Sequence, residues 1–341
     1  MSLRLFYALL LIFGLSALPS RNGVWADIAA APFRTRNQSP FIQIYGLPFA
    51  EDARLVAPQQ LQVSLISDIA NNFISAETEG ERLEWDGETY RLALALRYGF
   101  GSRIELGLTV PYVGHSGGFL DGFIETWHDV FSLPQSGRPE ANRDQLSYLY
   151  SHDGNIEVDI HNAAHGIGDI RLSAGLHLYR ESTVSPRALA LRFSLELPTG
   201  DSDELLGSGS FDVALQLTAR DSATLARYHL ALFGSAGILY MSPSDVLPEQ
   251  QRPVVGFGSL GIHWRLLSWL APKVQVDWQS PFYHGSQFIQ LTSWSAQLVI
   301  GAALNLPWQI GLDVAVAEDL VVDTAPDIVF HIALTKQFKS F

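Results

Sequence analysis

Apolar and polar residues alternate along most of the chain after residue 60. Residues 90–98 read YRLALALRY, so one face of an extended strand carries Tyr and Leu while the other carries Arg and Ala. Residues 103–112 repeat the pattern as RIELGLTVPY. Further segments with this alternation are 170–178, 189–197, 211–218, 273–278, 309–316 and 328–335, with weaker ones at 61–69, 228–240, 254–266 and 294–304. We therefore predict about 12 strands of about ten residues, the length that a tilted strand needs to cross a hydrocarbon layer.

A soluble β-sandwich is the alternative, because its strands would also alternate. Sandwich strands are usually shorter, however, at about 5–6 residues. Arginine also recurs on the polar faces of the predicted strands, where a barrel would turn it into the lumen. We predict an all-β fold, a transmembrane antiparallel β-barrel that occupies residues 60–341.

The predicted connections alternate between short and long. The short ones are 99–101, 180–187, 220–227, 267–271 and 305–307, and the long ones are 73–89, 113–168, 198–210, 241–253, 282–293 and 318–327. Outer-membrane barrels have this asymmetry, with short periplasmic turns and longer extracellular loops. Both termini would then be periplasmic. Across two short turns, we expect Tyr98 to pair with Ser102 and Leu304 to pair with Trp308.

Aromatic residues cluster near the ends of the predicted strands, where barrels carry interfacial girdles. Near the short turns these are Tyr98, Phe100, Trp264, Trp269 and Trp308. Near the long loops they are Tyr90, Tyr112, Phe211, Tyr240, Trp278 and Trp294. The alternative is a scatter of core aromatics, which strand-end clustering disfavours.

The first 26 residues have the three parts of a secretory signal peptide. Arg4 precedes the apolar stretch 5–18, and Val24-Trp25-Ala26 offers a cleavage site after Ala26. An uncleaved anchor is the alternative, but the apolar stretch is shorter than the roughly 20 residues that a membrane helix needs. The chain has no cysteine and a formal net charge of −13, which argues against a nucleic-acid partner because phosphate binding needs clustered Lys and Arg.

Residues 27–59 separate the leader from the first predicted strand. This segment is rich in proline and polar residues but also carries Phe41, Ile42, Ile44, Tyr45 and Phe49, which a purely solvated linker would not need. We expect it to fold into the periplasmic mouth of the barrel as a partial plug.

Two sets of short motifs resemble known barrels of Gram-negative bacteria. Residues 34–40 (RTRNQSP) with 45–48 (YGLP) resemble the start of an uncharacterised outer-membrane family, domain-of-unknown-function family 3187. Residues 166–169 (GIGD) and 197–201 (LPTGD) resemble segments of related barrels that act as transporters in phenol meta-pathway degradation. The resemblance spans the mature chain and implies a barrel in the cell outer membrane, surrounded by lipid and lipopolysaccharide.

The terminal aromatic residue resembles the signal by which the barrel-assembly machinery recognises its substrates. Phe338 and Phe341 are the candidate recognition residues, which makes that machinery an implied partner. The apolar series of the last strand is even-numbered and includes Phe338, whereas Phe341 is odd-numbered. Either the strand ends near Phe338 or a bulge resets its phase.

The predicted lumen carries charges of both signs. The cationic candidates are Arg91, Arg97, Arg103, Arg171, Arg192 and Lys273, and the anionic ones are Glu105, Asp169, Glu196, Asp212, Asp277 and Asp313. Such residues either orient a polar solute in a pore or form an ion-pair network that fills the barrel. Small inward residues such as Ala93, Ala95 and Ala190 leave room for a channel or a plug.

The 113–168 loop is the longest predicted connection, and loops of that length tend to be functional. Apolar residues recur at helical spacing over 119–131, which predicts an amphipathic helix that either gates the mouth or rests on the outer leaflet. Segments 146–151 and 155–161 flank Asp153-Gly154, which predicts a hairpin.

Two kinds of chemistry need a test. His152, Asp153, Glu157, Asp159, His161 and His165 are close in sequence, but alternation in the hairpin explains their spacing and no metal-loop pattern matches, so we predict no metal and no cofactor. His284 with Ser286, and His115 with Ser116, have the look of a lipid hydrolase, but neither has an identifiable third member.

We expect a channel or transporter that passes small solutes, including hydrophobic or aromatic ones, and not an enzyme. The alternative is a closed barrel that serves structure or surface interaction. An aromatic-lined route favours transport, whereas a lumen packed shut by Arg–carboxylate pairs favours the closed barrel.

Overall fold

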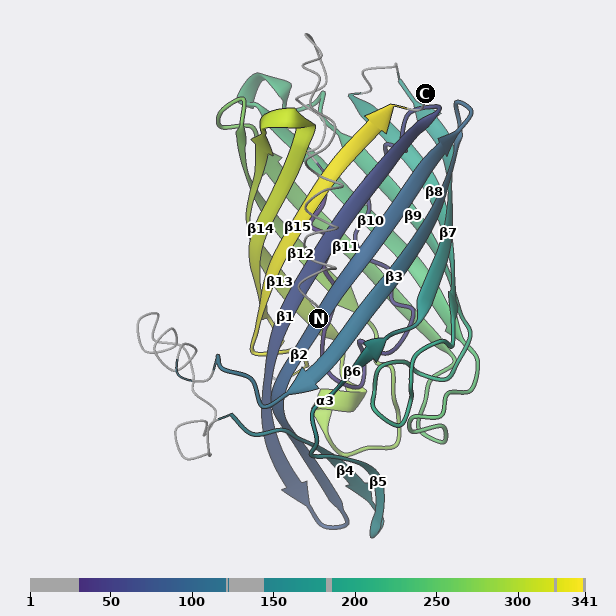
Figure 1. Cartoon of the computed structure of the whole chain (residues 1–341), viewed down its shortest axis with the longest axis vertical. Helices are drawn as coiled ribbons and strands as arrows, with labels where there is room; N and C mark the ends of the chain where they lie inside the picture. Colours follow the sequence, from purple (N-terminus) through teal and green to yellow (C-terminus); the bar gives the residue numbers. More distant parts are fainter. Residues whose placement is uncertain (1–30, 121, 123–143, 182–185, 322–323, 340–341) are drawn as a thin grey trace.

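Twelve long antiparallel strands form the closed wall of a β-barrel (Figure 1). The computed structural model describes residues 31–120, 122, 144–181, 186–321 and 324–339. The wall strands are β1 (Gln60–Thr78), β2 (Glu81–Phe100), β3 (Ile104–Ser116), β7 (Ile170–Arg180), β8 (Arg187–Leu197), β9 (Asp212–Asp221), β10 (Leu230–Met241), β11 (Val254–Trp264), β12 (Leu270–Gln279), β13 (Ser295–Leu306), β14 (Ile310–Asp319) and β15 (Ile328–Lys339). Each of them lies on one of the segments whose alternation predicts a strand, so the predicted antiparallel membrane barrel is confirmed.

The first and last strands close the wall. β1 pairs with β15 in one continuous antiparallel register, from Gln60 opposite Lys339 to Asn71 opposite Ile328. Closure leaves the wall without the unpaired strand edges that an open sheet exposes. The register has no bulge, so the phase of β15 is not reset before Lys339. Phe341 lies outside the described residues.

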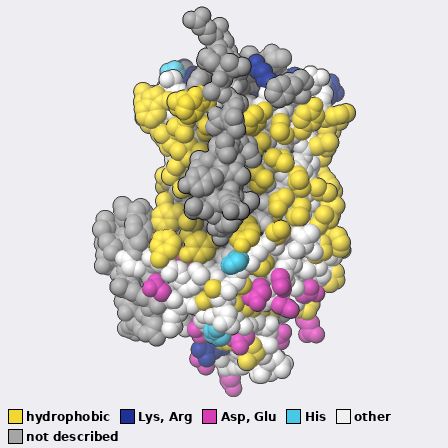
Figure 2. Space-filling model, viewed as in Figure 1, with side chains coloured by type: hydrophobic (Ala, Val, Ile, Leu, Met, Phe, Trp, Pro, Cys, Tyr) yellow, Lys and Arg dark blue, Asp and Glu magenta, His cyan; other side chains and the backbone are white. Residues whose placement is uncertain are grey.

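Side chains alternate across the wall as the sequence pattern predicts. Outward positions carry large apolar residues such as Ile238, Leu260 and Ile300, which are 57 %, 67 % and 53 % exposed. On the face that Figure 2 shows, hydrophobic side chains cover the barrel between its two ends, and charged residues gather at those ends. A wall whose apolar residues face outward is suited to lipid and not to water.

The two register predictions across short turns are wrong, each by the same amount. Tyr98 pairs with Leu106 instead of Ser102, and Leu304 pairs with Leu312 instead of Trp308. In both hairpins the strands continue two residues further before the chain reverses. The reversals lie where φ is positive, at Gly101 (65°) in one turn and at Trp308 (61°) in the other.

The first of these predictions wrongly placed Gly99 in the turn. It lies within β2, and a Cβ there would stand 2.1 Å from the carbonyl oxygen of Ala57. The backbone amide of Gln59 also donates to the Gly99 carbonyl at 2.9 Å. This glycine therefore admits a neighbouring backbone instead of forming the turn.

The expected loop over residues 73–89 is also not a loop. β1 continues to Thr78 and β2 begins at Glu81, so that only two residues form the turn. Beyond the barrel mouth, β4 (Ser147–His152) pairs with β2, and β5 (Asn155–Ile160) pairs with β4. The extension buries Leu83 and Trp85, and that burial favours strand over loop.

The long connections contain further short elements. The predicted hairpin around Asp153-Gly154 is confirmed by the pairing of β4 with β5. β6 (Ala164–Ile167) precedes β7 and pairs with the end of β3, so it extends the wall toward the long-loop end. The other elements are η3 (Ala226–Tyr228), α3 (Ile289–Thr292) and η4 (Pro307–Gln309). The expected helix over 119–131 lies almost entirely outside the described residues, as does the predicted leader 1–26.

Among the helices of the described residues, none has both the length and the apolar character needed to cross a membrane.

Candidate functional site

Residues 31–59, here called the N-terminal segment, run inside the barrel. Almost every residue from 32 to 50 is buried although no strand or regular helix forms there. The segment contacts inward side chains of many strands. Its amide at Phe33 donates to Gln275 of β12 at 2.9 Å, and its amide at Val56 donates to Glu105 of β3 at 2.7 Å. The barrel interior is therefore filled by a separate piece of chain and not by the wall side chains alone.

Arg36 organises the turn of this segment at the long-loop end. Its guanidinium donates to the carbonyl oxygens of Gln43, Tyr45 and Leu47 at 2.7, 2.6 and 2.7 Å. Backbone carbonyls buried without partners are costly, and a non-helical stretch inside a barrel has many of them. One buried cation thus lets the chain reverse direction inside the lumen.

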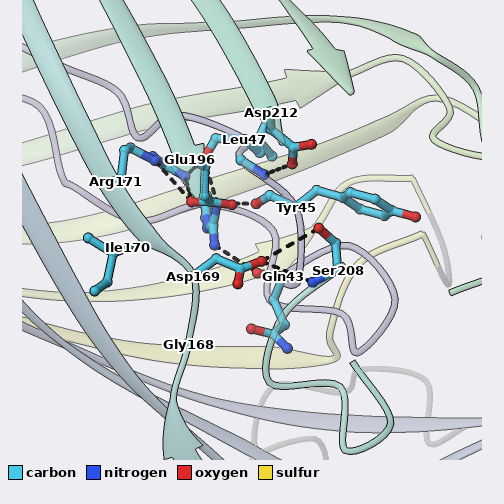
Figure 3. A network of polar contacts seen from close by, with 12 residues as sticks. Gln43, Tyr45, Leu47, Gly168, Asp169, Ile170, Arg171, Glu196, Ser208 and Asp212 are labelled. Atoms are coloured by element: carbon cyan, nitrogen blue, oxygen red, sulfur yellow. Dashed lines mark hydrogen bonds and ion pairs between the residues drawn. The ribbon is translucent and has the colours of Figure 1, made fainter. Parts of the chain in front are cut away.

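A charged network fixes the middle of the segment to the wall (Figure 3). Arg171 of β7 donates to Glu196 of β8 at 2.8 Å and to the Leu47 carbonyl at 3.1 Å. The amide of Gly46 donates to Asp212 of β9 at 2.6 Å. A Cβ on Gly46 would lie 2.7 Å from the Cβ of Asp212, so only glycine permits this approach.

A second charged layer lies toward the short-turn end. Arg192 of β8 donates to Glu105 at 2.8 Å and to the Asp52 carbonyl at 2.7 Å. Arg220 of β9 donates to the Asp52 carboxylate at 2.8 Å. Wall arginines therefore bind both the carbonyl and the carboxylate of one residue in the N-terminal segment.

Glu51 is the other carboxylate that the segment brings to this layer. It pairs with Arg97 of β2, and its carboxylate lies 3.7 Å from the Arg34 guanidinium. Burial alone would raise the pKa of Glu51, but Arg97, Arg34 and Arg192 outweigh burial and lower that pKa to about 2. Glu51 is therefore ionised at neutral pH and bridges segment and wall as a charge.

Asp169 accepts hydrogen bonds from the loop that connects β8 with β9. It accepts from the amides of Thr199, Gly200 and Ser208 at 2.8, 2.7 and 3.0 Å. These amides belong to the connection between β8 and β9: Thr199 and Gly200 lie in the LPTGD sequence, and Ser208 lies seven residues after it. The residue thus anchors a loop at the long-loop end.

The remaining lumen candidates are scattered. Lys273 of β12 pairs with Asp313 of β14 at 2.8 Å and donates to the Ala31 carbonyl at 3.0 Å. Asp277 accepts from Gln275 at 2.9 Å. Arg91 is buried on β2. Arg103 does not join the others: it lies in the turn before β3 and is exposed, because the strand begins one residue later than the alternation predicts.

Several interior residues were not among the candidates. They are Arg34, Arg36, Glu51, Asp52, Asp68, Arg220 and His331. Asp68 and His331 occupy polar positions of their alternating strands, so the alternation could have identified them as inward residues. Nothing in the sequence identifies Arg34, Arg36, Glu51 and Asp52 in this way, because no periodicity marks which residues of an irregular segment face a barrel wall.

Aromatic side chains close the long-loop end of the interior. Phe41 of the segment packs edge-on against Trp85 and Tyr150, with ring centroids 5.3 and 6.3 Å apart. Tyr45 stacks on Phe282 at 5.3 Å. All of these rings belong to one buried apolar cluster. This end of the bore is therefore sealed by apolar contact.

The opposite end is hollow. A cavity of about 270 Å³ lies between the N-terminal segment and the short-turn ends of β1, β2, β7 and β15. Its lining includes Arg34, Arg97 and Arg180 together with glutamines and small apolar residues. The interior thus has an apolar seal at one end and a polar vestibule at the other.

The candidate metal and hydrolase residues have other contacts. His161 pairs with Asp159 at 2.8 Å, and His165 contacts the hydroxyl of Tyr112 at 2.7 Å. His115 contacts Thr89 and the Leu205 carbonyl, and Ser286 accepts from the Phe288 amide. Across the described part of the chain, no three His, Cys, Asp or Glu side chains converge on a possible metal position.

Comparison with known families shows which family the chain belongs to. Residues 5–338 match the family described as "Protein of unknown function (DUF3187)". The chain belongs to this family. Among curated proteins, none matches the chain.

Solved structures show the same architecture. The COG4313 outer membrane channel from Pseudomonas putida F1 aligns with a TM-score of 0.55 at 15% identity, covering 83% of this chain and 97% of that one. Two toluene transporters superpose less closely. The Pseudomonas putida transporter TodX has a TM-score of 0.37 at 9% identity, with 92% and 96% of the two chains covered. The Ralstonia pickettii transporter TbuX has 0.37 at 10%, with 85% and 91% covered. At such identities, the likeness to the COG4313 channel shows that this DUF3187 chain has the fold of an outer-membrane barrel.

Proposed function

We propose that this protein is an outer-membrane channel or transporter for small solutes, and that the N-terminal segment is its plug. The observation that carries the proposal is the division of the interior between two pieces of chain. The wall turns small residues such as Ala93, Ala190 and Ala214 inward, and all three are buried. Ala93 shares an apolar cluster with Phe49 of the segment, and Ala214 shares one with Tyr45.

The Arg–carboxylate pairs of the interior close the barrel in this state. Two of them, Arg97 with Glu51 and Arg220 with Asp52, join the wall to the N-terminal segment and not wall to wall, so displacement of the segment would open the bore.

The contacts between plug and wall suit a segment that moves. Its polar contacts are individual hydrogen bonds and ion pairs, such as Gly46 to Asp212 and Arg192 to Asp52, beside the apolar contacts at the long-loop end. When such contacts open to water, both partners can be hydrated, so the net cost of each is about 0.5–1.5 kcal/mol for neutral pairs and about 1.5–3 for charged ones. Displacement needs no unfolding of the wall.

The aromatic seal at the long-loop end supports passage of hydrophobic or aromatic solutes. A solute with an apolar ring can replace the contacts that Phe41 makes with Trp85 and Tyr150. A hydrated sugar cannot, because it would have to lose water without new partners. Small aromatic molecules are therefore the solutes that we expect to pass the plugged barrel.

The proposal includes an orientation. The long loops face outward, the short turns and both termini face the periplasm, and lipid with lipopolysaccharide surrounds the apolar band. The apolar band between charged ends in Figure 2 supports insertion in a bilayer, and the short turns at one end with the long connections at the other support this orientation. Assembly through the C-terminal strand, with Phe338 and Phe341 as recognition residues, is part of the same proposal.

Liposome swelling tests the function. Vesicles carrying the full chain are compared with vesicles carrying a variant without residues 33–58, using sugars, amino acids and small aromatics. We expect the full chain to admit small aromatics, and the deletion variant to admit all three classes faster. If neither protein admits any solute, the barrel is closed and serves structure or surface interaction.

A reversible lock tests the plug without deleting it. The chain has no cysteine, so Gly46→Cys with Asp212→Cys would create one defined disulfide. A Cβ at residue 46 would lie 2.7 Å from the Cβ of Asp212, so the segment must yield by about 1 Å to reach disulfide geometry. Conductance in planar bilayers should fall on oxidation and recover on reduction. Equal conductance in both states would show that the segment does not control the bore.

A further inference from the structure

We propose that the vestibule at the short-turn end binds a small organic carboxylate, with Arg34 and Arg180 as its anion-binding residues. The inference rests on the proposed function in one respect, because it names the charge that a transported solute carries. The site itself is defined by the cavity of about 270 Å³ and can be tested without transport.

Arg34 has donors that no described residue satisfies. Its side chain is only 9% exposed and lines the cavity. Its Nε and Nη1 atoms make no hydrogen bond to any described residue. The Glu51 carboxylate is 3.7 Å from Nε, too far for a hydrogen bond. A buried guanidinium with unused donors is costly unless a ligand satisfies them.

A bulge turns Arg180 toward the same cavity. Up to His177, the odd-numbered residues of β7 face inward, and His177 pairs with the buried Ala190. The register then shifts by one residue, which leaves Leu178 and Tyr179 both exposed and places Arg180 opposite the buried Ala188. Without the bulge, Arg180 would face outward. The bulge therefore turns the Arg180 side chain from the outer face toward the lumen.

The carboxylates of the vestibule are already paired. Asp52 lies 2.8 Å from Arg220, and Asp313 lies 2.8 Å from Lys273. Glu51 is paired with Arg97. Each acidic lining residue thus has a nearer cation than Arg34 or Arg180, so the unused donors of Arg34 remain for a ligand.

The rest of the lining selects an organic anion over an inorganic one. Apolar surface comes from Pro32, Leu55, Val56 and Ala333, and polar atoms come from Gln60, Gln62, Thr335 and Gln337. A planar carboxylate matches the fork of a guanidinium, and an attached ring or short chain would cover the apolar part. Benzoate combines both properties and is the probe.

Isothermal titration of the full chain in detergent micelles with benzoate tests the site. We expect binding that Arg34→Gln weakens about ten- to hundredfold, the loss for a buried hydrogen bond to a charged group. Arg180→Gln, whose side chain is more exposed, should weaken it about two- to fivefold. No hydrogen bond or ion pair joins Arg180 to the described residues of the N-terminal segment, so its variant tests the site without disturbing the plug. Arg103→Gln, in an exposed turn at the same end of the barrel, should bind as the unaltered chain does.

Several results would overturn the assignment. They are no benzoate binding to the unaltered chain, equal binding of the neutral isostere benzamide, and affinity for inorganic phosphate that matches benzoate. Unchanged affinity in both arginine variants would overturn it as well. If benzoate binds as expected but does not cross vesicles that carry the protein, the site stands and the transport proposal fails.

Discussion

The Nδ1 atom of His331 lies 2.7 Å from the Oδ1 atom of Asp68. The two residues face each other across the seam where the last strand meets the first. The other carboxylate oxygen of Asp68 accepts from Gln38 of the N-terminal segment at 3.3 Å. One buried carboxylate therefore contacts a side chain of the last strand and a side chain of the N-terminal segment.

Removing this carboxylate should destabilise the seam. We expect Asp68→Ala to lower the free energy of unfolding by about 2–3 kcal/mol, because a buried hydrogen bond to a charged group is lost and the His331 ring loses its carboxylate partner. Urea unfolding in lipid vesicles, followed by tryptophan fluorescence, measures the change. A double-mutant cycle with His331→Ala should give a coupling energy of about 1–3 kcal/mol.

Ser64→Ala is the matched control at the same seam. It removes the neutral hydrogen bond between Ser64 and Thr335, which measures 2.9 Å, and should cost about 0.5–1.5 kcal/mol. If Asp68→Ala costs no more than this control, the Asp68–His331 pair has no special place in closing the barrel.

A methyl group at residue 46 should loosen the plug. Gly46→Ala places a Cβ 2.7 Å from that of Asp212, so the segment must move away from β9 and its 2.6 Å hydrogen bond must lengthen. Single-channel recordings should show openings at least about threefold more frequent, since roughly 1 kcal/mol of contact is lost. Gly256→Ala is the control, because the Cβ there would meet nothing nearer than Ser280 Oγ at 4.0 Å. Identical recordings for the two variants would contradict the plug.

Truncating the aromatic seal should change which solutes pass. Phe41→Ala removes a fully buried ring from between Trp85 and Tyr150 and leaves a cavity at the long-loop end. Such truncations cost about 3–5 kcal/mol in a packed core. Swelling assays should show faster uptake of bulky aromatic solutes, with little change for glycine. A uniform increase for all solutes would mean that Phe41 is only part of a steric block.

A charged side chain on the outer face of the barrel should lower the free energy of unfolding more the nearer it lies to the middle of the bilayer. Ile300 lies midway along β13 and is 53 % exposed, whereas Leu306 ends the same strand on the same face. We expect Ile300→Arg to cost about 2–4 kcal/mol of unfolding free energy in lipid vesicles and Leu306→Arg about 0–1. Equal costs would mean that the middle of β13 does not lie in hydrocarbon.

Much of the wall could be predicted from the sequence because lipid on one side and an enclosed interior on the other impose a strict period of two. Ile300 and Leu260 are outward for the same reason that Arg97 and Glu105 are inward. Exact turns were less predictable. Gly99 and Gly101 look alike in sequence, yet one admits the Ala57 backbone and the other adopts a positive φ.

The interior was only partly predictable. Arg171 and Arg192 could be found because they sit on alternating strands. Their wall partners Glu196 and Glu105 could be found in the same way. Their partners on the N-terminal segment could not, since Leu47 and Asp52 lie more than a hundred residues away on a segment without periodicity. The inward turn of Arg180 was hidden too, because a bulge leaves no mark on the apolar pattern of β7.

The Asp68 contacts have a consequence for biogenesis. Once all twelve strands are hydrogen-bonded in a closed ring, the folded turn around Arg36 cannot enter the lumen between two strands. Residues 31–59 directly precede β1, whose pairing with β15 completes the ring, so we expect them to be enclosed as these two strands pair. We therefore expect closure of the seam and enclosure of the N-terminal segment to be coupled, because Asp68 has both of its partners only when both are complete.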